Sequence, residues 1–183
     1  MDAPDDTAPV EEYGDNGRLR RRSRMAGGLL HGLQEQFDDA GNLALLAQFE
    51  AGKLHGVMAV YDADGVLVQR CAFRHGLAHG LLETFVSGRR VAARTMVDGV
   101  ANGESLSFDD AGQLSAQLQL AAGQLDGPLR RYWQNGVLME ETMYRDGVAL
   151  DAPARFDQQG RALGQAGKPP GLFERFRRLV RRD

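Results

Sequence analysis

Hydrophobic and polar positions repeat along most of the chain with a period close to 24 residues. Large aromatic side chains mark the clearest column, which contains Tyr13, Phe37, Tyr61, Phe85, Phe108, Tyr132 and Phe156. Successive members are separated by 24, 24, 24, 23, 24 and 24 residues. Self-similarity at a fixed period is typical of repeat architectures, in which each repeat is one supersecondary unit. We therefore expect a stack of similar units.

Two glycine motifs follow the same period and divide each repeat into two parts. The first has the form aromatic-Asp-x-x-Gly-x-Leu, as in FDDAGNL, and its glycines are Gly17, Gly41, Gly65, Gly88, Gly112, Gly136 and Gly160. The second has the form Gly-x-x-x-Gly and occupies residues 28–32, 52–56, 76–80, 99–103 and 123–127. In its sixth copy Asp151 replaces the final glycine. We therefore expect the last repeats to be irregular.

The segments between the glycine motifs are about 7–10 residues long, which is short for a stable helix and typical of a strand. The Asp-x-x-Gly tetrad favours a type I turn that is closed by a glycine at positive φ. Each repeat is thus predicted to be a β-hairpin, with Gly41, Gly65, Gly112 and Gly136 as structural turn residues. The one missing residue near Gly88 predicts a tighter turn there.

Alternation within the strands predicts that one face of the sheet is buried. Leu43, Leu45, Ala47 and Phe49 share a face by the period of two, and the segment 114–120 repeats this pattern. A lone hairpin is marginally stable, so neighbouring hairpins must stack, and the aromatic column becomes a buried ladder with rungs ~10 Å apart.

These patterns predict an all-β fold, an elongated stack of about six to seven 24-residue β-hairpin repeats followed by a short C-terminal amphipathic α-helix. We divide the chain into an acidic leader at 1–12 that is predicted to be disordered, a repeat array at 13–163, and a linker with a basic helix at 164–183. No apolar run resembles an export signal or a membrane span. A single cysteine, Cys71, excludes an intrachain disulfide, so we expect a cytoplasmic protein.

Charge is distributed unevenly over the 183 residues, whose net charge is -3. Residues 1–17 hold six acidic groups, whereas residues 18–24 hold five arginines and residues 168–183 hold six basic groups. The body between them is acidic. Duplex nucleic acid requires a broad basic face, so a nucleic-acid partner is not expected.

The C-terminal segment LFERFRRLVRR has helical periodicity, with an apolar stripe that includes Phe173 and Phe176. Three roles remain open: a cap on the last strand, a docking helix for a partner, or a weak contact with an anionic membrane. The candidate partner-binding or lipid-binding residues at the two ends are Phe173, Arg175, Phe176, Arg177, Arg178, Arg181, Arg182, Arg20, Arg21 and Arg22.

The spacing of the histidines and the position of the cysteine do not favour metal binding or nucleophilic catalysis. His31, His55 and His79 are separated by whole repeats of ~10 Å, whereas ligands of one zinc ion lie ~2 Å from it, so turn stabilisation is favoured over metal binding. His75 and His79 share one turn but lack a third ligand. Cys71 occupies a column with Ala47, which favours a buried apolar role over a nucleophile. We expect no enzyme, catalytic residue, metal or cofactor.

The paired motifs, above all the GKLHG copy at 52–56, resemble the MORN repeat, and the 24-residue form resembles the bacterial MORN-variant subfamily. The resemblance covers residues 13–163. It implies a non-catalytic binding scaffold whose partner is a protein, and more narrowly an antitoxin or immunity protein that sequesters a toxin or effector. Two alternatives remain: a peripheral scaffold that binds anionic lipid through its basic ends, and a structural scaffold that self-associates through open sheet edges.

Overall fold

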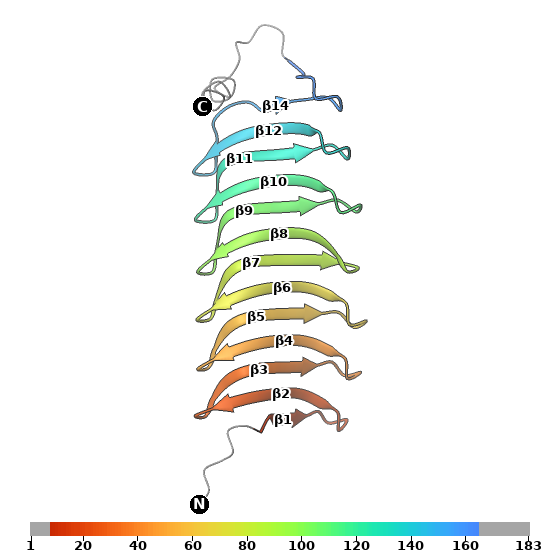
Figure 1. The fold of residues 1–183 in the computed structure, drawn as a ribbon, viewed down its shortest axis with the longest axis vertical. Helices are drawn as coiled ribbons and strands as arrows, with labels where there is room; N and C mark the ends of the chain where they lie inside the picture. Colours follow the sequence, from red (N-terminus) through yellow and green to blue (C-terminus); the bar gives the residue numbers. More distant parts are fainter. Residues whose placement is uncertain (1–7, 165–183) are drawn as a thin grey trace, which may run out of the picture.

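The computed structural model describes residues 8–164, which form one antiparallel sheet of 14 strands (Figure 1). Strands pair in the order of the sequence from β1 to β13, and β14 pairs with β12. Their bounds are β1 Val10–Tyr13, β2 Leu19–Ala26, β3 Leu29–Phe37, β4 Leu43–Glu50, β5 Lys53–Tyr61, β6 Leu67–Arg74, β7 Leu77–Val86, β8 Arg89–Val97, β9 Val100–Phe108, β10 Leu114–Ala121, β11 Gln124–Tyr132, β12 Leu138–Arg145, β13 Val148–Ala149 and β14 Ala154–Arg155.

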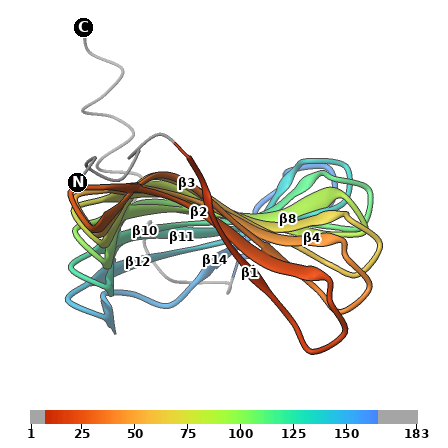
Figure 2. The ribbon, with the colours of Figure 1, turned by 90° about the horizontal axis from the view of Figure 1, so that it is seen from below.

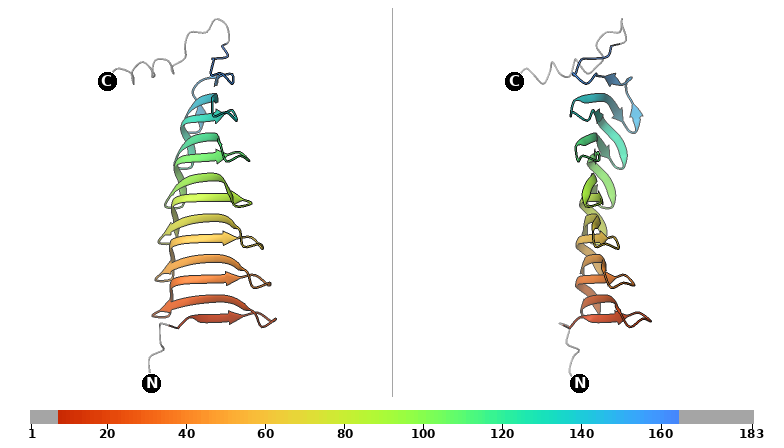
Figure 3. Two further views of the ribbon diagram at one scale, coloured as in Figure 1. Left: turned by 45° about the vertical axis from the view of Figure 1, so that its right-hand side comes forward. Right: turned by 90° about the vertical axis from the view of Figure 1, so that its right-hand side faces the viewer.

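The described part of the chain is a long, narrow single layer. Strands lie like the rungs of a ladder, and successive rungs rotate about the long axis (Figures 2 and 3). This twist follows from the right-handed twist of each strand. The predicted all-β stack of hairpins is confirmed, and the sheet begins at Val10, before the predicted array boundary at residue 13. The segment with helical periodicity lies outside the described residues.

Each Asp-x-x-Gly motif forms the loop at one margin of the sheet. In the loop at 38–41, the Gly41 amide donates to the Asp38 carbonyl oxygen at 3.0 Å, and the Asn42 amide donates to the Asp38 carboxylate at 2.8 Å. The φ angles of Gly41, Gly65 and Gly112 are 94°, 75° and 78°, which confirms the predicted turn. The shortened loop is a two-residue turn at 87–88 with φ values of 49° and 74°, as the missing residue predicts.

The opposite margin carries tight two-residue turns, in which the first glycine of the Gly-x-x-x-Gly motif is the second residue. In one of them Ala51 and Gly52 have φ values of 47° and 79°, the signature of a type I′ turn. The Gly52 amide also donates to the Leu30 carbonyl of the preceding hairpin at 2.8 Å. The glycines at 76, 99, 123 and 147 make the corresponding bond. These bonds tie each hairpin to the one before it.

The last glycine of the motif lies at a bulge, where the register shifts. Gly127 has a φ of 122°, and a Cβ atom there would lie 2.9 Å from the Cβ of Gln119. Asp151 occupies the corresponding position in the next repeat, and Pro153 two residues later cannot donate a ladder hydrogen bond. The strand of that repeat is accordingly split into β13 and β14. The expected irregularity is thus found in the last repeat, whereas the turn at 133–136 in the repeat before it has the same backbone hydrogen bonds as the loop at 38–41.

The expectation that one face of the sheet is buried is wrong. The buried apolar residues are small side chains and Leu120, and they are distributed over both faces: Ala47, Ala59, Cys71, Ala93 and Leu120. No described element forms a second layer, so burial comes only from neighbours within the sheet. Leu43 pairs with Phe37, whereas Leu45 pairs with the adjacent Gln36. Because adjacent strand residues point to opposite faces, Leu43 does not share the face of Leu45.

The aromatic column is half-buried rather than buried. Tyr61 is only partly covered by its neighbours, and Tyr13 in the first strand is 61% exposed. We therefore expect Tyr61→Ala to lower the free energy of unfolding by about 2 kcal/mol, below the cost of truncating a fully buried aromatic side chain. Asp64→Ala, an exposed change in the same repeat, is the control and is expected to cost little. Equal denaturation midpoints for the two variants would contradict this ladder.

Candidate binding surface

The register divides the central side chains between two faces of very different chemistry. One row of directly paired residues crosses β2 to β12 and contains Ser23, Gln34, Ala47, Met58, Cys71, Leu82, Arg94, Ser105, Leu118, Leu129 and Thr142. The next row, on the opposite face, contains Arg22, Glu35, Leu46, Ala59, Arg70, Glu83, Ala93, Leu106, Gln117, Arg130 and Glu141. We name these the uncharged face and the ion-pair face, because the first central row is uncharged except for Arg94 and the second contains most of the ion pairs.

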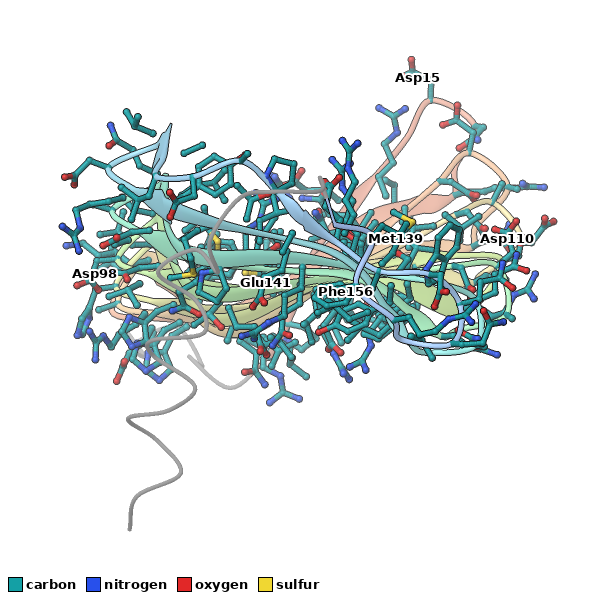
Figure 4. The ribbon with its side chains drawn as sticks, turned by 90° about the horizontal axis from the view of Figure 1, so that it is seen from above. Asp15, Asp98, Asp110, Met139, Glu141 and Phe156 are labelled. Carbon is teal, nitrogen blue, oxygen red and sulfur yellow. The ribbon has the colours of Figure 1, made fainter. Side chains whose placement is uncertain are left out.

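Cross-strand ion pairs dominate the ion-pair face. Arg22 lies 2.9 Å from Glu11 and 3.4 Å from Glu35. Near the other end, Arg130 Nε donates to Glu141 Oε1 at 2.8 Å, and the carboxylate of Glu141 is almost fully buried. Figure 4 shows Glu141 between the two margins of the sheet, which are marked by Asp98 and Asp110. The charges in the central row of this face therefore have partners of opposite charge within the chain.

Glu83 is the centre of the most connected ion pair. Its carboxylate accepts from Arg70 Nε at 3.0 Å and from Arg90 Nη1 at 3.1 Å, and its side chain is only 8% exposed. Arg90 also lies over the ring of Phe108, with 4.7 Å between the guanidinium carbon and the ring centroid. Hydrogen bonds from Arg70 and then Arg90 outweigh burial and lower the pKa of Glu83 below its usual value of 4.5.

A lowered carboxyl pKa links the stability of the sheet to pH. The folded state binds the Glu83 proton more weakly than the unfolded state, so this stabilisation is complete above the unfolded pKa near 4.5 and is lost as pH falls through the folded pKa. We expect the melting temperature of the wild type to exceed that of Glu83→Gln at neutral pH. The difference should shrink below pH 4.5. A difference that is independent of pH would contradict this linkage.

The uncharged face has few charged side chains. A second row on this face contains Gln36, Leu45, Val60, Gln69, Thr84, Ala92, Ser107 and Ala116 between β3 and β10. Among the described residues of these two rows from β3 to β10, Arg94 alone is charged. The carboxylates of Glu12 and Glu140 on this face lie only near its two ends, where they pair with Arg21 and with Arg131 and Arg155.

The N-terminal arginines proposed as contact residues already have partners in the sheet. Arg20 lies 3.1 Å from Asp39, Arg21 pairs with Glu12, and Arg22 pairs with Glu11. These contacts place the acidic residues at 11 and 12 in β1, inside the segment that the sequence assigned to the leader. The C-terminal candidates from Phe173 to Arg182 lie outside the described residues.

The histidine column makes contacts at the tight turns. His79 Nδ1 lies 3.2 Å from Asp98, whose pKa is lowered by Arg74 and then by His79. His55 Nδ1 lies 3.1 Å from a carboxylate oxygen of Glu50 without hydrogen-bond geometry. The His55 ring is edge-on to the His75 ring, with 5.3 Å between the ring centroids. Within residues 8–164, no group of three or more His, Cys, Asp or Glu side chains is arranged to hold a metal ion.

Two further observations concern the buried cysteine and the secondary structure. Cys71 is 1% exposed, and burial raises the pKa of its thiol, which disfavours the nucleophilic thiolate. In the described part of the chain, no helix has the length and apolar character needed to cross a membrane.

Arg94 was not among the residues that the sequence singled out. The signal was present, because its column holds only uncharged residues in the other even-numbered strands: Ser23, Ala47, Cys71, Leu118 and Thr142. Assigning faces by alternation requires the positions of the bulges, however, and the motifs alone do not give the register across them.

Three solved structures show weak likenesses to this chain. A mutant of S. aureus TarM, in complex with fondaparinux, α-GlcNAc-glycerol and UDP, is 10% identical over 51% of this chain and 19% of that chain, with a TM-score of 0.38. A second TarM structure is 14% identical over 56% and 21%, with a TM-score of 0.36. A porin-like protein from Bacteroides uniformis is 11% identical over 79% and 87%, with a TM-score of 0.24. At these TM-scores none of the three establishes a shared fold.

This chain spans about a fifth of the length of the TarM structures, and no curated protein matches it. Comparison with protein families gives a match. The family described as MORN repeat variant matches residues 125–146, which run from β11 through β12. The matched segment is one repeat of the array, and the same pattern of turns and bulges recurs in the preceding hairpins. The matched hairpin is therefore similar to the MORN repeat variant, and the hairpins before it share its geometry.

Proposed function

We propose that the chain is a non-catalytic repeat scaffold that binds another protein. The observation that carries this proposal is the single-layer sheet. One face has few charged side chains, and on the opposite face the charges of the central row form ion pairs within the chain. An extended surface that no described element covers suits contact with a large partner. It does not provide the enclosed, pre-organised constellation that catalysis requires.

The finer proposal is an antitoxin or immunity protein that sequesters a toxin or effector. It is supported by the resemblance to bacterial MORN variants, and the extended surface is compatible with covering a partner. Contact with nucleic acid is disfavoured by the neutralised arginines, because phosphate binding needs basic groups that are free to displace counterions. Contact with lipid through Arg20, Arg21 and Arg22 is disfavoured for the same reason.

The test uses the product of the neighbouring gene in the native host. That product is expressed in a heterologous host with and without the full chain, and growth is recorded together with size-exclusion chromatography of the purified mixture. Restored growth and a stable stoichiometric complex are expected. Growth arrest that the chain does not relieve, with no complex, would contradict the antitoxin proposal.

Two further measurements separate the alternatives. Pelleting with liposomes that contain anionic lipid, for the full chain and for a chain lacking residues 169–183, tests membrane binding. Sedimentation velocity tests self-association through the outer edge of β1, which is only four residues long and therefore offers few backbone groups to a second β1. We expect neither pelleting at physiological salt nor a concentration-dependent oligomer.

A further inference from the structure

Arg94 lies near the middle of the uncharged face. It is exposed on β8, and it is paired in register with Leu82 of β7 and Ser105 of β9. Met96 and Ala92 are its neighbours on the same face of its own strand. Its Nε donates a long hydrogen bond of 3.4 Å to the hydroxyl oxygen of Ser105. A neutral hydroxyl does not balance the charge of the guanidinium.

The arginines in the central row of the ion-pair face contrast with Arg94. Arg22, Arg70 and Arg130 each have a carboxylate within 3.4 Å. On the uncharged face, the nearest strand beyond β8 that carries a carboxylate is β12, four strands away or ~19 Å at the usual strand spacing. Arg94 therefore has no carboxylate partner among the described residues of its face.

The fold itself does not require an arginine at this position. Equivalent positions in the other repeats hold Ser23, Ala47, Cys71, Leu118 and Thr142, and each fits the same strand geometry without a charge. A charged residue that departs from the local pattern without a compensating charge is characteristic of a functional position. Arginine is also the side chain best suited to bidentate recognition of a carboxylate.

We propose that the uncharged face around Arg94 binds an apolar segment of a partner protein, and that a carboxylate of this segment pairs with Arg94. The inference rests on the proposed binding function and deepens it by naming the chemistry of the partner. Partly exposed apolar side chains on the same face, Leu82, Met96 and Leu118, supply contact area on either side of the ion pair. Exclusion of water by these contacts strengthens the pair.

The test uses a defined peptide as the probe and the full chain as the receptor. The peptide is a blocked amphipathic helix whose leucine stripe contains one central glutamate, and two versions carry glutamine or lysine instead. Dissociation constants come from fluorescence anisotropy, and methyl NMR of Leu82, Met96 and Leu118 maps the site. We expect the glutamate peptide to bind the wild type about tenfold more tightly than the glutamine peptide, the ratio that one charge-assisted hydrogen bond gives.

Three variants make the result specific. Arg94→Leu should abolish the preference for glutamate without lowering the melting temperature, which separates recognition from a structural role. Arg94→Glu should reverse the preference towards the lysine peptide. Arg24→Glu is the matched control. Arg24 lies on β2 between Ser23 and Met25, so it is on the ion-pair face, and the same charge change there should leave the preference unchanged.

Several outcomes would overturn the inference. They are the absence of peptide binding, equal affinity for the glutamate and glutamine peptides, methyl shifts confined to the ion-pair face, and a lower melting temperature for Arg94→Leu. A complex with the neighbouring gene's product that tolerates Arg94→Glu would also overturn it while leaving the proposed function intact. Conversely, glutamate-dependent peptide binding without any such complex would support this inference and contradict the antitoxin proposal.

Discussion

Replacement of Gly127 by alanine is expected to lower the free energy of unfolding by about 3 kcal/mol. A φ of 122° is unfavourable for any residue with a side chain, which costs about 1–3 kcal/mol. The new Cβ would also lie 2.9 Å from the Cβ of Gln119, so the neighbouring strand must move, and such overpacking costs about 1–3 kcal/mol. Chemical denaturation of the full chain measures the sum.

The matched control is Gly136→Ala. Gly136 also has a positive φ, of 77°, but nothing lies within 4 Å of the position of its Cβ. Only backbone strain of about 1 kcal/mol is expected there. If the two variants lose the same stability, the close approach between β10 and β11 at Gln119 does not exist in solution. Asp151 holds the position equivalent to Gly127 in the last repeat, and the strand is split into β13 and β14 there.

The second large effect is expected for Glu83→Lys, at about 3 kcal/mol of destabilisation. The variant would place a third positive charge between Arg70 and Arg90, at a position where the present side chain is only 8% exposed. Reversing one member of a buried ion pair leaves uncompensated charge in a poorly hydrated site. The midpoint of urea denaturation, with an unchanged slope, reports this loss.

Glu83→Leu is the discriminating control. Arg70 and Arg90 are about half exposed, so without the carboxylate they can turn to water. The equivalent positions hold Ala59 and Leu106, which shows that the sheet accommodates an apolar residue there. We expect this variant to lose much less stability than Glu83→Lys. Similar losses for both would indicate that hydrogen bonding by the carboxylate, rather than charge balance, stabilises this part of the sheet.

The sequence predicted the parts of the fold that depend on local backbone chemistry. Turn glycines such as Gly65 indicate a backbone with positive φ, because few other residues adopt positive φ without strain. The missing residue beside Gly88 likewise shortened its turn as expected. Periodicity then gave the hairpins and their stacking order, because strands joined by short turns pair with their sequence neighbours.

Burial and the binding surface could not be predicted in the same way. Alternation indicates which side chains share a face, but it does not show whether a second layer covers that face. The bulges beside the Asp-x-x-Gly loops also change the parity, as at Ala44 between Leu43 and Leu45. The bulges at the Gly-x-x-x-Gly motifs keep it, as between Ala47 and Phe49. The pairing of Arg22 with Glu35, and the lack of a carboxylate beside Arg94, became visible only when the register across all bulges was fixed.

Strands β1 to β13 each pair with their neighbours in the sequence, and this has a consequence for how the chain folds and unfolds. Contacts between residues close in sequence form quickly, because little loop entropy is lost before each hairpin closes. Stability in such an array is a sum of hairpin terms and interface terms, so unfolding under force should begin at an end and proceed hairpin by hairpin. The split pair β13 and β14 is the weaker end, since two short strands there replace one long one. Pulling experiments should therefore show steps of about one 24-residue repeat, starting at the C-terminal side.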